Sequence, residues 1–425
     1  MTEVRRLLVR PEIKAAFANA QPHDFLVALR DELNMSQRTI ATFTGISQTT
    51  IHRYLAGPRD AKRDHMLKLV NGFELPPALV VPEHVVDPPV GSPTTHSIGS
   101  LADMTSRATT QWRENEMDID QIDKALADLR AAAPELQRLN DLDGGSARLR
   151  VMAGEFVDLA DRVAQQNLDP RRGRLAARLK GELSMLTGWL NYDGGDQVRA
   201  RQYWNTALLH AQLSEDPLHE VYALESLAAQ ATYYLARPKE AVAFSRRAQT
   251  LAGTRCGPRI RSLLELREAC AWAVMNDEQQ FLRHYKLAEA HFDRSGSTDE
   301  PEWVRFYGES ELKGLFALAM GDLAKPAAAE ERFAGALAEV EDGFSRNRLY
   351  YASMLAKTRL LLGDATGAAE IADHRFFAAA AQTGSARTRN HAQAILTMAT
   401  ASTTAGAKTI REHAVAAEFV RSPHG

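Results

Sequence analysis

The sequence predicts an all-α protein in which a small helical domain at the N-terminus precedes a helical-repeat solenoid. Apolar residues recur at the spacing of an α-helix along most of the chain, for example over 119–139, 147–163, 175–190 and 198–213. No convincing run of alternating β-branched residues appears. The breaks between helical segments are short, which favours antiparallel helix pairs, and they fall at 143–145, 193–196, 216–217, 253–258, 295–301, 321–322 and 363–364.

The composition is that of an ordinary globular chain. Of its 425 residues, 45% are hydrophobic and 25% are charged. These proportions exclude wholesale disorder, a collagen-like fibre and a disulfide-stapled miniprotein, and two cysteines alone fit a reducing compartment. No segment reads as a membrane span and the N-terminus lacks the apolar core of a signal peptide, so we expect a cytoplasmic protein without membrane contact.

The formal net charge of −3 is unevenly distributed. Residues 1–80 hold eleven Lys and Arg against eight Asp and Glu, whereas the remainder holds 40 against 46. This asymmetry favours a small anion-seeking domain on an acidic body. Between the two, residues 81–99 are rich in Pro, which fixes φ and removes backbone donors, so an extended linker is predicted there. The expected domains are therefore 1–80 and 100–425.

The N-terminal domain contains two short predicted helices joined by a sharp turn. Ser36 is a suitable N-cap for the first helix, and Gly45 stands where the chain must turn with positive φ. Ser47 caps a second helix over 48–55, which Gly57 ends. Ile51, Tyr54 and Leu55 are predicted to face inward, as are Ile40 and Ala41 on the first helix.

That arrangement leaves one face of the second helix polar and exposed. Its residues are of the kind that read base edges in the major groove, since Gln pairs with adenine, Arg with guanine, and Thr offers a methyl group to thymine. A helix-turn-helix uses the start of its second helix for this purpose. The exposed residues are Gln48, Thr49, Thr50, His52 and Arg53.

Over about residues 23–80 the chain resembles the lambda-repressor-like DNA-binding domains of the XRE family. The resemblance rests on these matching positions: Gln37, Ala41, Gly45, Ile46, Ser47, Gln48 and Ile51. The resemblance implies that Gln37 and Arg38 touch phosphate and that Gln48, Thr49 and Arg53 face bases. Thr50 and His52 would lie at the edge of the groove, and Ser47 belongs to the same contact set. Further phosphate contacts are expected from the following loop, at Arg59, Lys62 and Arg63. A helix-turn-helix that binds only another protein is the alternative.

The body resembles tetratricopeptide repeats in a degenerate form. Small and large residues recur in register, because small ones let paired helices approach and a large aromatic fills the gap to the next pair. The repeats are longer than the roughly 34-residue consensus, and an irregular helical domain is the alternative. The positions are Gly188, Ala200, Trp204 and Ala207; Ala229, Ala241 and Ala248; Ala269, Tyr285 and Ala288; Phe333 and Ala336; Ala356 and Ala368.

A repressor-like domain followed by such repeats is similar to two groups of regulators. One is the actinobacterial regulators of secondary metabolism and development, and the other is the peptide-pheromone receptors that serve quorum sensing in Gram-positive bacteria. The segment 7–13 and the Gly-Gly turns at 144–145 and 194–195 are closer to the first group. The resemblance implies a transcription regulator controlled by a peptide, a small molecule or a protein partner.

We therefore expect a homodimer on a pseudo-palindromic operator in double-stranded DNA, with dimerisation and effector binding in the 100–425 domain. Candidate effector contacts face the groove of the solenoid, although packing between repeats is an alternative for each: Trp189, Tyr192, Gln230, Tyr233 and Tyr234. No zinc-protease, phosphate-loop or dinucleotide motif occurs, so we expect no enzyme, no cofactor and no metal. The rival function is an interaction scaffold or anti-activator without its own operator.

Overall fold

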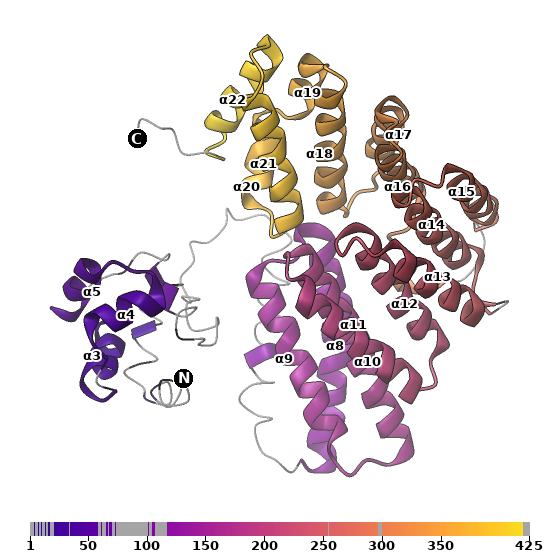
Figure 1. Ribbon diagram of the computed structural model, residues 1–425. Coiled ribbons are helices and arrows are strands. Elements are labelled where there is room, and N and C mark those ends of the chain that lie inside the picture. The colour runs from indigo at the N-terminus through magenta and orange to yellow at the C-terminus, as the bar shows by residue number, and fades with distance from the viewer. Residues whose placement is uncertain are drawn as a thin grey trace. The chain divides into compact units, whose positions relative to one another are not determined.

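The computed structural model divides into two compact units, a head (Met1–His96) and a body (Ser97–Gly425). It describes residues 4, 7, 10, 13, 16–17, 21–33, 35–57, 61, 65–66, 68–69, 73, 101, 104–106, 117–253, 255–295 and 300–419. The predicted linker, 81–99, lies outside these residues. Every regular element in the described ranges is a helix, which confirms the all-α prediction (Figure 1).

The head packs three described helices around one apolar core. They are α3 (His23–Asp31), α4 (Gln37–Thr44) and α5 (Gln48–Leu55). Phe25 and Leu29 from α3, Ile40 from α4 and Ile51 from α5 are completely buried in this core. The helix-turn-helix pair α4–α5 is therefore held against α3 by contacts that the apolar spacing predicts.

The body is a stack of helices joined by short turns. The four predicted helical segments lie within α8, α9, α10 and α11, each of which extends further than predicted. The helices are α8 (Ile119–Asp143), α9 (Ala147–Ala164), α10 (Pro170–Asp193), α11 (Gln197–Leu213), α12 (Pro217–Tyr233), α13 (Pro238–Ala252), α14 (Pro258–Val274), α15 (Glu278–Phe292), η2 (Glu302–Val304), α16 (Glu309–Asp322), α17 (Pro326–Ala338), α18 (Ser345–Leu361), α19 (Ala365–Ile371), α20 (His374–Gln382), α21 (Ala386–Thr400) and α22 (Ala405–Ala416).

Successive helices of the body pair with one another. Helix α10 packs on α11, α12 on α13, α14 on α15 and α16 on α17, and the first helices of neighbouring pairs also touch. Proline starts five of the described helices, where its missing N–H costs nothing, and Asp caps several others. The fold is thus a repeat-like helical stack, as the sequence predicts.

Several turns of the stack differ from the sequence prediction, and those at 275–277, 339–344, 372–373, 383–385 and 401–404 were not predicted. The break predicted at 321–322 lies slightly later, since α16 continues to Asp322 and Ala324 takes the left-handed turn position. The turn between α12 and α13 escaped prediction altogether. Its left-handed residue is Ala236, with φ 50°, where a Gly or Asn would have marked the turn in the sequence.

Small residues hold the first complete pair together. Gly188 of α10 lies against the ring of Trp204 of α11, and a Cβ at Gly188 would stand 2.3 Å from Trp204 Nε1. Trp204 is fully buried, and its Nε1 donates to the Met185 carbonyl at 3.3 Å. The alanines at the corresponding positions, Ala200 and Ala207, are also buried. The small and large residues that recur along the sequence are therefore the residues that pack α10 against α11.

Replacing Gly188 with Ala is expected to destabilise the body by about 1–3 kcal/mol, because the buried Trp204 ring has no room to shift. Urea unfolding followed by Trp fluorescence reports the body alone, since all five Trp lie after residue 100. The matched control is Gly173→Ala in the same helix, where no atom lies within 4 Å of the added Cβ and stability should hold or rise. Equal stability of both variants would contradict this account of the pair.

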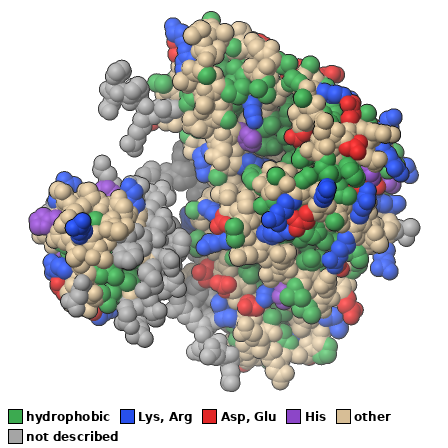
Figure 2. Space-filling view, in the orientation of Figure 1, with side chains coloured by type: hydrophobic (Ala, Val, Ile, Leu, Met, Phe, Trp, Pro, Cys, Tyr) green, Lys and Arg blue, Asp and Glu red, His purple; other side chains and the backbone are tan. Residues whose placement is uncertain are grey.

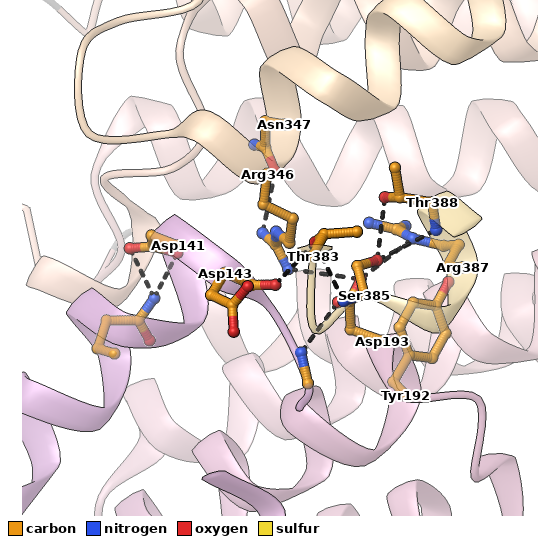
Figure 3. Close-up of polar contacts among 12 residues, drawn as sticks. Asp141, Asp143, Tyr192, Asp193, Arg346, Asn347, Thr383, Ser385, Arg387 and Thr388 are labelled. Carbon is orange, nitrogen blue, oxygen red and sulfur yellow. Dashed lines mark hydrogen bonds and ion pairs between the residues drawn. The ribbon is translucent and has the colours of Figure 1, made fainter. Parts of the chain in front are cut away.

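The last helices of the body fold back onto the first. Helix α18 contacts α8, and the turn at 383–385 meets the turn at 143–145. Thr383 Oγ1 donates to the Asp143 carbonyl at 3.0 Å, and the Gly384 N–H donates to the Asp143 carboxylate at 2.8 Å. We call this junction of 143–145 with 383–385 the seam (Figure 3).

Candidate functional site

Two helix N-caps and one glycine turn fix the angle between α4 and α5. Ser36 Oγ accepts from the Thr39 N–H at 3.1 Å at the start of α4, and Ser47 Oγ accepts from the Thr50 N–H at 3.2 Å at the start of α5. Gly45 ends α4 in the left-handed region, with φ 65°. All three assignments made from the sequence are confirmed, and α5 has the predicted limits of 48–55.

One face of α5 is buried and the other is exposed. Ile51, Tyr54 and Leu55 are buried, as predicted. Gln48, Thr49, His52 and Arg53 are exposed on the opposite side, within an arc of about 140° at the helical pitch. The helix therefore presents a polar face from a rigidly packed base.

The remaining predicted DNA contacts lie near that face. Arg38 and Ser47 are exposed, whereas Gln37 and Thr50 are half-buried. Gln37 Nε2 lies 3.4 Å from His52 Nδ1, and the Thr50 and Ser47 hydroxyls are 2.8 Å apart. Gln37 therefore braces the start of α4 against α5. Three predicted phosphate contacts lie outside the described residues: Arg59, Lys62 and Arg63.

The exposed face is cationic. The described segment 35–57 contains Arg38 and Arg53 and no Asp or Glu. On the visible face of the head, Figure 2 shows several blue Lys and Arg and purple His side chains on a largely uncharged surface, with a little red Asp or Glu at its lower edge. Base-reading side chains beside positive charge are what a helix needs to lie in the major groove between phosphates.

Two hydrogen bonds that the sequence did not suggest hold α5 from behind. His23 Nδ1 lies 2.9 Å from the Tyr54 carbonyl oxygen, and the Tyr54 hydroxyl lies 2.8 Å from His65 Nδ1. Both involve residues well separated in sequence, so no local signal marks them. They position α5 and leave its polar face free.

Replacing Gly45 with Ala should loosen this pair of helices, because an L side chain in the left-handed region costs about 1–2 kcal/mol. No atom lies within 4 Å of the added Cβ, so the cost is conformational alone. A loss of about 1 kcal/mol corresponds to roughly five-fold faster hydrogen exchange at α4 and α5 amides. Gly45→Asn, which tolerates this conformation, should lose less; an equal loss in both variants would contradict the conformational explanation.

A second candidate site lies in the body, where a cavity of about 480 Å³ is lined by α8, α10, α12, α14, α16, α18 and α21. We call it the inner cavity. Four of the five predicted effector contacts line it, namely Trp189, Tyr192, Tyr233 and Tyr234. Gln230 does not: it is fully buried, and its amide donates to the Gln197 carbonyl at 2.7 Å, so it packs between repeats.

The last helices of the body supply a wall of this cavity that the sequence did not predict. Arg346, Tyr350 and Lys357 of α18 and Arg387 and His391 of α21 line it, although these helices lie more than 100 residues from the first candidates. The fold-back at the seam brings them there, and a repeat pattern alone gives no sign of it. Burial and the neighbouring Arg387 and Lys357 lower the pKa of His391 to about 4.

Within the described residues, no group of three or more His, Cys, Asp or Glu side chains is placed to hold a metal ion. None of the described helices is both long and apolar enough to cross a membrane.

Residues 26–80 match a family model described as helix-turn-helix, of the HTH_3 family. This match and the geometry of α4 and α5 confirm an XRE-like helix-turn-helix domain of the kind that DNA-binding regulators carry. No curated protein matches the chain.

Proposed function

We propose that the protein is a sequence-specific transcriptional regulator that binds a pseudo-palindromic operator in double-stranded DNA as a homodimer. The observation that carries this proposal is the exposed face of α5, where Gln48, Thr49 and Arg53 stand on a helix whose other face is buried. When a helix-turn-helix docks on DNA, its second helix lies in the major groove, so α5 would lie there and Arg38 at the start of α4 would contact a phosphate.

The body supplies dimerisation and effector binding in this proposal. We take its helix pairs to be degenerate tetratricopeptide-like repeats, as in the actinobacterial regulators that the sequence resembles. The effector binds in the inner cavity. Trp189, Tyr192, Tyr233 and Tyr234 lining one cavity support this role. An effector changes DNA binding only if it favours one arrangement of the two heads over another. No catalytic role is proposed.

The test is recovery of bound DNA from a genomic library, followed by nuclease footprinting with purified protein and no added partner. We expect a protected site with two half-sites one helical turn apart, about 10–10.5 base pairs centre to centre, or a multiple of it. Retention of all sequences alike, or of none, would reject the proposal. The second outcome would favour the scaffold or anti-activator function.

A further inference from the structure

The inner cavity has a particular chemistry, and we propose that it binds a small organic anion with a flat aromatic body. This inference rests on the proposed effector role and specifies the class of ligand. The cavity volume of about 480 Å³ lies in the range of sites for single small molecules. Because α18 packs back on α8, the walls come from both ends of the stack.

Aromatic side chains form much of the wall. Trp189 and Tyr192 meet edge to face with ring centroids 5.2 Å apart, and Tyr192 meets Tyr234 at 4.7 Å. Tyr350 contributes another ring from α18. Rings held against one another offer an apolar body a rigid surface, with little side-chain entropy lost on binding.

Positive charge is concentrated on the wall made by α18 and α21. Nine residues of these two helices line the cavity; three of them, Arg346, Lys357 and Arg387, are cationic, and none is acidic. The Arg387 guanidinium lies 4.3 Å from the centre of the Tyr350 ring. Among the described residues, Lys357 has no ion pair. An aromatic surface and cations thus lie side by side.

The nearby carboxylate does not neutralise this wall. Asp193 faces two guanidinium groups, with its Oδ1 at 3.4 Å from Arg387 Nε and 3.8 Å from Arg346 Nη1 (Figure 3), and Arg346 also acts electrostatically on Asp141. The other carboxylate oxygen of Asp193 accepts from the Gly145 N–H at 3.1 Å. Arg387 Nε is buried and makes no hydrogen bond, and the same holds for Asp193 Oδ1, which faces it. A ligand carboxylate at this wall would supply the missing negative charge.

Three acidic residues line the cavity elsewhere: burial opposes the ionisation of Asp141 and Asp322, and the carboxylate of Glu311 is engaged in a hydrogen bond. Asp141 accepts from Gln137 Nε2 at 3.0 Å, and Glu311 accepts from the Tyr351 hydroxyl at 2.5 Å. Burial raises the pKa of Asp141, and it raises the pKa of Asp322 to about 6. The low pKa of His391, due to burial and then to Arg387 and Lys357, is a further sign of positive potential at the α18–α21 wall.

The experiment compares aromatic acids with their neutral amides on the full chain by isothermal titration calorimetry. The probes are 2-naphthoate, biphenyl-4-carboxylate and indole-3-acetate, each with its amide. At least one acid should bind ten-fold or more tightly than its amide. A ratio of that size is on the order of what one charge-assisted hydrogen bond contributes to the affinity. No binding by any of the acids, or equal binding of acid and amide, overturns the inference.

Two variants locate the effect. Lys357→Gln and Arg387→Gln should each remove most of the preference for the acid. Should circular dichroism show that the Arg387 variant is misfolded, the result for Lys357→Gln is the deciding one. Lys408→Gln is the matched control, since Lys408 is exposed on α22 and, within the described part of the chain, pairs with Glu412. A preference that survives in Lys357→Gln overturns the inference.

DNA retention by the same preparation separates this inference from the proposed function. Acid-selective binding without operator binding rejects the regulator and leaves the cavity's ligand class standing. Operator binding without any acid preference rejects the ligand class and leaves the regulator standing.

Discussion

Replacing both Gln48 and Arg53 with Ala is expected to abolish sequence-specific DNA binding. Each bidentate contact to a base contributes about 1–3 kcal/mol of discrimination, so losing two should lower the affinity for the operator on the order of 100-fold or more. Binding to unrelated DNA should change far less, because phosphate contacts supply most of it. Gel-shift titrations with the operator and a scrambled duplex measure both quantities.

The fold should survive this double substitution. Both side chains are exposed, and neither makes a hydrogen bond within the described residues, while the buried base of α5 is untouched. Arg38→Ala is the matched control. It should weaken binding to both duplexes by the same factor, and it should lower the salt dependence of the binding constant by the equivalent of about one phosphate contact. Unchanged discrimination by the double variant would show that another surface reads the DNA.

The head was predictable because its signals are local. Ser36, Gly45 and Ser47 each act on a backbone group within a few residues, so their types and spacing fix both helix ends. The polar face of α5 follows from the same short segment. What escaped prediction there is longer in range, such as the bond from the Tyr54 hydroxyl to His65.

The body was predictable only in part, for the same reason. Its pairs are marked by Pro and Asp at helix starts, and Pro238 marks the start of α13, but the left-handed residue of the turn before it is Ala236, where a Gly or Asn would have completed the signal. Gln230 was misassigned because α12 is buried almost all round, from Val221 to Thr232, so no single face is distinguished by polarity. The seam joins residues some 240 positions apart, and no short pattern encodes such a contact.

A buried ion pair should make Glu225→Ala the most destabilising change in the body that we predict. Arg267 Nε donates to Glu225 Oε1 at 2.6 Å, and the side chains are 4% and 0% exposed. Removing the carboxylate leaves a guanidinium buried without its counter-charge, which costs about 3–5 kcal/mol. Urea unfolding followed by Trp fluorescence should show this loss, whereas Glu412→Ala, at an exposed pair, should change stability by less than about 0.5 kcal/mol.

The double variant Glu225→Leu with Arg267→Met tests the cause. If the cost in Glu225→Ala comes from the unpaired charge, replacing both partners with apolar side chains should recover most of it, to within about 1–2 kcal/mol of the wild type. If the double variant is as unstable as the single one, the loss comes from packing between α12 and α14, and the ion pair contributes little. Arg267 also lines the inner cavity, so a stable double variant that still prefers aromatic acids would place the anion at the α18–α21 wall and away from α14.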